Sequence, residues 1–418
     1  MRAPVSSPLD RRKAERARAR APNGIALCIS FAALLLPVCG PLLALGFEAQ
    51  EKARLPRPRK LDQAIRWQRD PTTGDLRPTA EVGRATGTDQ SAGPNPDSIH
   101  VDTRLVPVTC SVSTDTGTAL PGLGPGDFRI FDDGIEQSIS YFDASTLPAS
   151  VALVIDASPS VLRDSVEMKG AADALVDALA PLDEAAVVDF SAHTYLQLPF
   201  SDVRERVRRA VARVDPRQLL GDTGGSNIYE AVYLTARELF AGRSGRKSIV
   251  LLTDGQDSGL GLTLDPASAS PEAGIRGDRL TFDDVARTLA AEDIQIFAVS
   301  TENRPRVMTT EWLTTHRDKT LLTPEARRLA IPPYTLYLAE LVRRTGGEIY
   351  FLREAETMAD AFRRIAQTIR AEYTLGYYPS PASPAAAHRG WHELLVEVAG
   401  ERSFRVVHRA GYYVPGAN

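Results

Sequence analysis

Residues 149–160 read ASVALVIDASPS, and this stretch decides the fold. The apolar run 151–155 is typical of a strand that is buried on both faces, as the strands of parallel sheets are. Asp156 ends this strand, and Ser158 and Ser160 follow at alternate positions. Open α/β sheets bind ligands in the crevice at the carboxyl ends of their strands, so we expect these three side chains to lie there.

The chemistry of these three side chains leaves two interpretations open. Mg²⁺ takes about six oxygen ligands and keeps waters among them, so one carboxylate and two hydroxyls can supply about half of its shell. Asp and Ser also cap helix N-termini often, because their side-chain oxygens accept hydrogen bonds from backbone N–H groups. These residues alone favour neither interpretation, and two later segments favour the metal site.

The first of these segments, residues 223–230, reads TGGSNIYE. Its glycines allow a tight backbone, Ser226 supplies another hydroxyl, and a helix is expected to begin at Asn227. The second segment, residues 248–257, reads SIVLLTDGQD and indicates a buried strand that ends at Asp254. Three loops therefore bring oxygen ligands to one edge of the predicted sheet.

This order of motifs (D-x-S-x-S, then GGS before a helix, then a strand ending in TDG) resembles the von Willebrand factor type A (VWA) domain, over residues 149–372. The resemblance implies a doubly wound α/β fold with a mainly parallel sheet. It also implies a metal-ion-dependent adhesion site for Mg²⁺, or for Mn²⁺ or Ca²⁺. The implied metal ligands are Asp156, Ser158, Ser160, Ser226 and Asp254. Ser226 stands where the family usually has Thr, so the hydroxyl is retained.

Composition narrows the functional classes. The chain has 418 residues, 43% hydrophobic and 24% charged, which is typical of a globular protein longer than one ordinary domain. The net charge is −4, and the sequence has no basic domain that would indicate binding to nucleic acid. Of the three cysteines only Cys110 lies outside the N-terminal apolar segment, so the folded part has no partner for a disulfide.

Residues 1–50 are predicted to take the protein out of the cytoplasm. Six Arg or Lys residues between positions 11 and 20 precede an apolar run at 25–45. Small residues within 44–46 suit cleavage by a signal peptidase. The apolar run is also close to the length of about 20 residues that spans a bilayer. Residues 1–50 are therefore either a cleaved signal peptide or a retained membrane anchor. The protein is expected to be periplasmic, secreted or anchored in the membrane.

Residues 51–97 are predicted to form a disordered spacer, and residues 98–147 an N-terminal β segment. Residues 148–372 are predicted to form the VWA domain, and residues 373–418 a C-terminal β segment. The spacer is rich in Arg, Pro, Thr, Gly and Asp, and its few large apolar residues cannot offset the cost of ordering. Within the VWA domain, residues 301–333 show weak helical character and no clear fold. Residues 256–278 form either a partner-selecting loop or a tolerated insertion, and Asp257 is a candidate acceptor of hydrogen bonds beside the metal ligands.

The two β segments resemble the flanks of bacterial VWFA-related proteins, through GDFRIFDDG at 126–134 and through EYTLGYYP and RAGYYVP at 372–379 and 409–415. The Asp-Asp-Gly at 132–134 predicts a hairpin between strands at 128–131 and 138–142. Each segment has fewer than about 50 residues, which seldom hold a core of their own. We therefore expect the two segments to pair into one β-sandwich, with the VWA domain inserted between its strands.

Enzyme function is the weaker class, and no catalytic residue is assigned. Asp156 lacks the second carboxylate two residues on that phosphatases with an aspartate nucleophile need, and Ser160 lacks a G-x-S-x-G elbow. His388 and His392 are four residues apart, but Gly390 between them indicates a turn, so packed or exposed histidines are expected there rather than a zinc pair.

The resemblance implies a protein-binding module that acts outside the cytoplasm and needs a divalent cation. Two carboxylates balance the charge of the ion and neutral hydroxyls donate weakly, so the ion keeps a position for an Asp or Glu carboxylate of a partner protein. A membrane is involved only through the N-terminal segment. The alternative is a structural or assembly factor of the cell envelope that uses the VWA fold as a scaffold without a functional ion.

Overall fold

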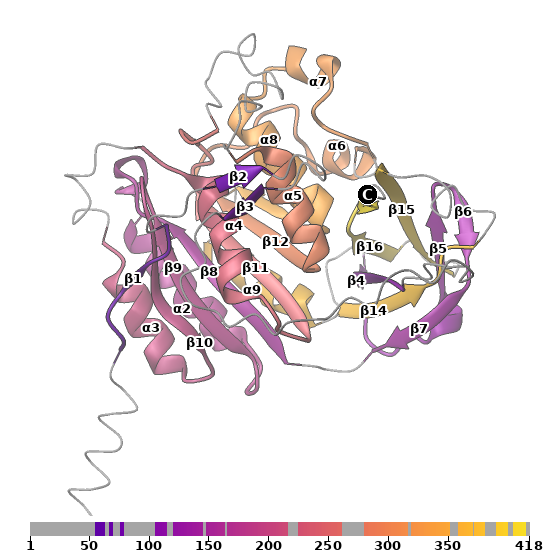
Figure 1. The fold of residues 1–418 in the computed structure, drawn as a ribbon, viewed down its shortest axis with the longest axis horizontal. Helices are drawn as coiled ribbons and strands as arrows, with labels where there is room; N and C mark the ends of the chain where they lie inside the picture. Colours follow the sequence, from indigo (N-terminus) through magenta and orange to yellow (C-terminus); the bar gives the residue numbers. More distant parts are fainter. Residues whose placement is uncertain are drawn as a thin grey trace, which may run out of the picture. The chain divides into compact units, whose positions relative to one another are not determined.

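The apolar run at 151–155 lies in β8 (Ala149–Asp156), the central strand of a seven-stranded sheet (Figure 1). The strand order is β1-β10-β9-β8-β11-β12-β13. Strands β9, β8, β11, β12 and β13 are parallel, and β10 and β1 add antiparallel pairs at one edge. The other strands are β1 (Arg59–Lys60), β9 (Glu184–Phe190), β10 (Thr194–Ser201), β11 (Arg246–Thr253), β12 (Ile294–Ser300) and β13 (Ile349–Phe351).

The computed structural model describes residues 55–62, 67–69, 76–78, 105–114, 120–144, 148–163, 165–215, 225–260, 280–316, 319–351, 358–370, 372–380, 390–399 and 404–414. The predicted export segment, residues 1–50, lies outside these ranges, as does most of the 256–278 loop. Within the described ranges, no helix is both long enough and apolar enough to cross a membrane.

Helices cover both faces of the sheet. The side chains of β8 therefore point alternately into two apolar cores, one between the sheet and the helices on each face. Val151, Leu153 and Ile155 pack with α2 (Ser165–Ala178), α3 (Arg204–Arg213) and α9 (Met358–Arg370). Ala152 and Val154 pack with α4 (Ile228–Leu239), α5 (Phe282–Ala291) and α8 (Pro333–Thr345) on the opposite face. This burial on both faces explains why the run 151–155 is apolar at every position. The predicted doubly wound α/β fold is confirmed.

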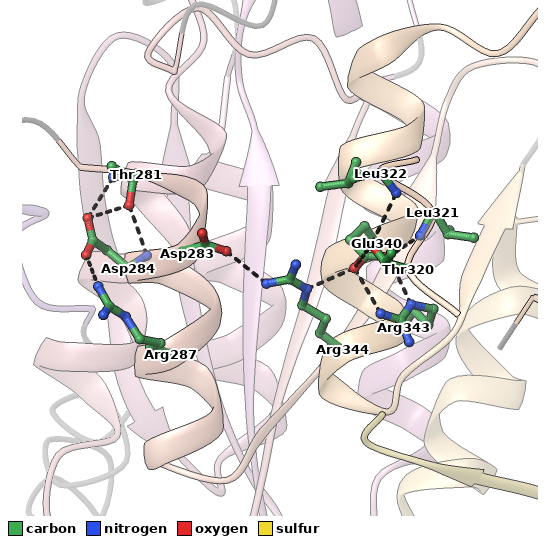
Figure 2. A network of polar contacts seen from close by, with 10 residues as sticks. All are labelled: Thr281, Asp283, Asp284, Arg287, Thr320, Leu321, Leu322, Glu340, Arg343 and Arg344. Atoms are coloured by element: carbon green, nitrogen blue, oxygen red, sulfur yellow. Dashed lines mark hydrogen bonds and ion pairs between the residues drawn. The ribbon is translucent and has the colours of Figure 1, made fainter. Parts of the chain in front are cut away.

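Residues 301–333 have more structure than the sequence analysis predicts. They include α6 (Thr310–Thr315) and α7 (Pro324–Arg328), which share a small apolar core with Leu336 of α8 and Phe351 of β13. Figure 2 shows how Glu340 of α8 connects to this segment: its fully buried carboxylate accepts hydrogen bonds from the Leu321 backbone N–H and the Thr320 hydroxyl. The two short helices agree with the predicted weak helical character, whereas the fold was not predicted, because its core is completed by α8 and β13 rather than by a local pattern.

The charge of Glu340 is balanced by two arginines of the same helix. Arg343 and Arg344 both donate hydrogen bonds to its carboxylate at 2.9 Å, and Arg344 also reaches Asp283 of α5 (Figure 2). Although burial alone would raise the pKa of Glu340, these hydrogen bonds and charges lower it. A network of this kind holds α5, α8 and the 320–322 segment together.

The segments on either side of the α/β region form a β-sandwich. One sheet has the order β16-β4-β14-β7 and the other β17-β15-β5-β6. The strands are β4 (Val106–Thr114), β5 (Phe128–Asp132), β6 (Ile135–Gln137), β7 (Ile139–Asp143), β14 (Glu372–Tyr377), β15 (Gly390–Val398), β16 (Phe404–His408) and β17 (Gly411–Val414). Strands from the two ends of the chain pair directly, β4 with β14 and β5 with β15 (Figure 1). Both sheets contribute to one apolar core that includes the free Cys110, so the predicted pairing of the flanks is observed.

The hairpin at Asp132-Asp133-Gly134 forms, but its second strand is not the predicted one. Asp133 and Gly134 have φ values of 49° and 79°, as a tight two-residue turn requires. Pairing therefore resumes at once, with Ile135 opposite Asp132, and the partner strand is β6. The predicted partner at 138–142 lies in the other sheet as β7, where it pairs with β14.

The prediction of a disordered spacer at 51–97 is wrong for residues 55–62. β1 pairs with the edge strand β10, and Leu61 is buried in the core on one face of the sheet. Asp62 contacts Nδ1 of His193 at 2.7 Å. An open sheet edge offers main-chain hydrogen bonds to any extended segment, whatever its side chains. A prediction of disorder from average composition therefore does not detect a strand of this kind. A further short pair, β2 (Trp67–Arg69) with β3 (Leu76–Pro78), also falls inside the predicted spacer.

Candidate metal centre

Two adjacent parallel strands bring the predicted ligands together at their carboxyl ends. The register of β8 and β11 pairs Ile155 with Leu252, so the next residues, Asp156 and Thr253, end the two strands side by side. α4 begins at Ile228, two residues after the predicted ligand Ser226. The described residues of the three motif segments therefore meet at one edge of the sheet.

Asp156 is the centre of this cluster and is buried. Its Oδ2 accepts a hydrogen bond of 2.7 Å from the Thr253 hydroxyl and one of 3.4 Å from the Ser226 hydroxyl. Its Oδ1 accepts a 2.9 Å hydrogen bond from the backbone N–H of Ser158. One carboxylate thus contacts residues from all three loops.

The two serines after Asp156 lie next to each other. Their hydroxyl oxygens are 2.9 Å apart, with Ser158 buried and Ser160 exposed. Ser158 precedes the short 3₁₀ helix η2 (Pro159–Val161), but its side chain makes no capping hydrogen bond to that helix. The capping interpretation is therefore not observed for Ser158, whose hydroxyl is directed to its neighbour instead.

Asp254 supplies a second buried carboxylate. Its Oδ1 accepts a 2.9 Å hydrogen bond from the backbone N–H of Gln256. Burial, and then the negative charge of Asp254, raise the pKa of Asp156 to about 6, against the hydrogen bonds that it accepts from Ser158 and Thr253. Two buried carboxylates that repel each other, with hydroxyls around them, are the oxygen donor set that a hard divalent cation stabilises. The residues present therefore fit such an ion.

A second layer of hydrogen bonds holds the Ser226 loop in place. Asp257 accepts hydrogen bonds from the backbone N–H groups of Tyr229 and Leu260, so it caps the start of α4 and does not contact a predicted ligand side chain. Ser258 donates its backbone N–H to the Ser226 carbonyl at 2.7 Å. Gly225 has a φ of 83°, which a residue with a side chain rarely adopts. The loop after β11 thereby positions the hydroxyl of Ser226.

Residues 151–256 match the family model of the von Willebrand factor type A domain. This part of the chain is a VWA domain. The matched range contains all five predicted ligands of the VWA site, whose role as metal ligands stays a prediction.

Three solved structures show similarity to the chain at low identity. An aerotolerance-related membrane protein from Bacteroides fragilis is 17% identical with a TM-score of 0.36, and the match covers 53% of this chain and 98% of that one. A von Willebrand factor type A protein from Catenulispora acidiphila is 13% identical with a TM-score of 0.37, covering 72% and 76%. Proximal thread matrix protein 1 from the mussel byssus, solved with zinc in its MIDAS motif, is 17% identical with a TM-score of 0.36, covering 55% and 47%. No curated protein matches the chain.

Two further residues lie at the VWA site and are not among its predicted ligands. Thr253 belongs to the TDG motif, and the parallel register of β8 and β11 is the signal that places it beside Asp156. Tyr334, the second residue of α8, lies next to Gly255, and its pKa is raised by burial and by the charges of Glu302 and Asp254. No sequence signal connects Tyr334 to the site, because its position depends on how α8 packs.

Proposed function

We propose that this protein is a binding module that holds a partner protein through a divalent cation at the VWA site. The observation that carries the proposal is the set of hydrogen bonds at Asp156, which joins all three motif loops, together with the second buried carboxylate of Asp254. The residues that would hold the ion are Asp156, Ser158, Ser160, Ser226 and Asp254.

The donor set favours Mg²⁺, with Mn²⁺ or Ca²⁺ as alternatives, since all five ligands offer oxygen. When bound, such an ion supplies an open coordination position for an oxygen of another molecule. The two carboxylates balance its charge, and hydroxyls are weak neutral donors, so an Asp or Glu carboxylate of the partner is the complementary ligand.

The chain's own residues prepare the site for a partner. Thr253 holds one oxygen of Asp156, and the Gln256 backbone holds one oxygen of Asp254, so neither carboxylate must reorient on binding. Ser160 is exposed while its hydroxyl contacts buried Ser158, which opens the site to solvent at this point. A partner can approach the site at Ser160 without unfolding the loops around it.

We place this activity outside the cytoplasm, in the periplasm, secreted or anchored in the membrane. The basic and apolar pattern of residues 1–50 supports this placement.

The test uses the full chain and compares two isosteric substitutions of buried aspartates. Asp156→Asn removes the central charge of the VWA site. Asp189→Asn is the matched control, because Asp189 is also buried, in the neighbouring strand β9, and bonds to Gln197 instead. Binding of Mg²⁺ and Mn²⁺ is measured by calorimetry, and partner capture is measured from envelope extract with and without EDTA.

We expect EDTA and Asp156→Asn to abolish capture alike, Asp189→Asn to leave it intact, and re-added Mg²⁺ to restore it. Amidation of the carboxylates in the extract should also prevent capture. If capture survives both EDTA and Asp156→Asn, the site has no functional ion and the alternative, an envelope scaffold, replaces the proposal.

A further inference from the structure

A second cluster of metal-ligating side chains lies in the β-sandwich, outside the VWA domain. Asp132 ends β5, Asp133 lies in the turn after it, and His392 belongs to β15, which pairs with β5. One ligand atom of each residue lies within 4.8 Å of the other two. Nδ1 of His392 is 2.8 Å from Oδ2 of Asp133 and 3.8 Å from Oδ1 of Asp132.

Each carboxylate in this cluster has one oxygen that the protein holds and one that faces the other ligands. Oδ2 of Asp132 accepts hydrogen bonds from the hydroxyls of Tyr377 at 2.8 Å and Tyr412 at 2.9 Å. Oδ1 of Asp133 accepts a 2.8 Å hydrogen bond from the backbone N–H of Glu393. Metal-binding carboxylates are commonly oriented in this way by outer hydrogen bonds.

The oxygen of Asp132 that faces the cluster has no hydrogen-bond donor among the described residues. The Asp132 side chain is fully buried, and its Oδ1 is a buried atom without a hydrogen-bond partner there. Buried polar atoms are nearly always satisfied, because an unpaired one costs the full desolvation of the group. His392, 1% exposed and stacked on Tyr412, directs Nδ1 toward the same point. A cation between the three ligand atoms would satisfy this oxygen.

We propose that Asp132, Asp133 and His392 bind a divalent transition-metal ion such as Zn²⁺. Imidazole and carboxylate ligands bind Zn²⁺ at about 2.0–2.2 Å, which places neighbouring ligand atoms of a tetrahedral shell about 3.3 Å apart. The distances of 2.8 and 3.8 Å from His392 Nδ1 lie on either side of this value. The imidazole also separates this site from the VWA site, since Mg²⁺ and Ca²⁺ prefer oxygen ligands alone.

The position of the cluster gives the ion a structural role. It would connect the β5–β6 turn to β15, and through Tyr377 of β14 and Tyr412 of β17 it would reach both sheets of the sandwich. Small domains that lack disulfides are often stabilised by a metal instead, and the described part of this chain has a single free cysteine. The Asp133 side chain is 26% exposed, so an ion and a water ligand can enter from solvent.

The test measures Zn²⁺ alone on full chain that carries Asp156→Asn, so that the VWA site does not contribute. Asp133→Asn and His392→Gln each remove one ligand. Asn tolerates the left-handed φ of residue 133 and keeps the acceptor for the Glu393 N–H, so the turn is preserved. Glu397→Gln, an exposed carboxylate of the same strand β15, is the matched control.

We expect the Asp156→Asn chain to bind one Zn²⁺ in equilibrium dialysis and to melt at a higher temperature with Zn²⁺ than after EDTA. Asp133→Asn and His392→Gln should each weaken Zn²⁺ binding by a factor of about 10–100 or more and remove the shift in melting temperature, whereas Glu397→Gln should change neither. X-ray absorption should show one imidazole in the zinc shell.

Two outcomes overturn this proposal. Either the Asp156→Asn chain binds no Zn²⁺, in which case hydrogen bonds alone hold the cluster together, or it binds Zn²⁺ with an affinity that both ligand substitutions leave unchanged. Neither outcome bears on partner capture at the VWA site.

Discussion

The hydroxyl of Thr253 donates a 2.7 Å hydrogen bond to Oδ2 of Asp156, and so joins the carboxyl ends of two adjacent parallel strands. The same hydroxyl accepts a 3.0 Å hydrogen bond from the backbone N–H of Gly255, directly after Asp254. Thr253 therefore positions the central carboxylate of the VWA site and the turn that carries the second one. Both bonds are buried, where a lost partner leaves the remaining group unsatisfied.

The first prediction concerns Thr253→Val, which keeps the shape of the side chain and removes its hydroxyl. We expect the affinity for Mg²⁺ to fall by about 10–100-fold, because Asp156 loses the donor that orients it. The stability loss should be about 1–3 kcal/mol, the cost of unsatisfied buried groups. Calorimetric titration with Mg²⁺ and urea unfolding measure the two effects.

The control is Thr235→Val in α4. Thr235 is fully buried and its hydroxyl oxygen has no hydrogen-bond partner in the described structure, so its replacement should be neutral or stabilising and leave Mg²⁺ affinity unchanged. Equal effects of the two substitutions would contradict a positioning role for Thr253.

The second prediction separates the hydroxyl of Ser226 from its size. Ser226→Ala removes the hydroxyl that lies 3.4 Å from Asp156 Oδ2, and we expect Mg²⁺ affinity to drop about tenfold or more. Ser226→Thr keeps the hydroxyl and should retain affinity within a few-fold. The same titration measures both, and a Ser226→Ala chain that binds Mg²⁺ as well as the unmodified protein would remove Ser226 from the ligand set.

The third prediction uses Glu372, the first residue of β14. Burial raises the pKa of this carboxyl to about 8, with further contributions from Asp293 and Asp183, although Arg246 opposes the shift. Its Oε1 has no hydrogen-bond partner within the described ranges. Because the folded state favours the neutral form, Glu372 contributes full stability below pH 4.5 and loses this contribution as the pH rises from about 4.5 through 8.

Glu372→Gln stays neutral at every pH, so it should resemble the unmodified protein near pH 5 and exceed its stability at pH 8, by about 3 kcal/mol. Urea unfolding at the two pH values measures the difference. Glu397→Gln, an exposed carboxylate, should show no such pH dependence. A stability change of the same size at both pH values would mean that Glu372 is ionised in the folded protein.

The fourth prediction tests how tightly α8 ends against the sheet. Gly346 caps the helix with a φ of 75°, and a Cβ atom on Gly347 would overlap the backbone carbonyl of Ile296 in β12. We expect Gly347→Ala to destabilise the protein by about 3 kcal/mol or more, since backbone cannot move aside as a side chain can.

Gly170→Ala provides the control for this substitution. Gly170 lies in α2, and a Cβ atom added to it would meet no other atom of the described residues within 4 Å outside its own helix backbone and chain neighbours. Ala should therefore stabilise the protein by about 0.5–1 kcal/mol. Thermal unfolding distinguishes the two glycines, and two substitutions of the same sign would contradict the close approach at Gly347.

Local patterns predicted most of the VWA domain. The apolar run of β8, its end at Asp156 and the start of a helix just after Ser226 all follow from residues close to each other in the chain. The order of Asp156, Ser226 and Asp254 at the ends of these elements likewise places them on one rim, because parallel strands end at the same edge.

The sequence by itself therefore determined the fold class, the order of the elements and which loops carry oxygen ligands, since periodicity and turn chemistry depend on neighbouring residues. Only the tertiary structure decided that β1 completes the sheet edge, that Thr253 orients Asp156, and that His392 meets Asp133 across 259 positions of the chain. These contacts depend on strand register and on the packing of distant segments. No short stretch of sequence encodes either one, because each is settled by the core that both partners bury together.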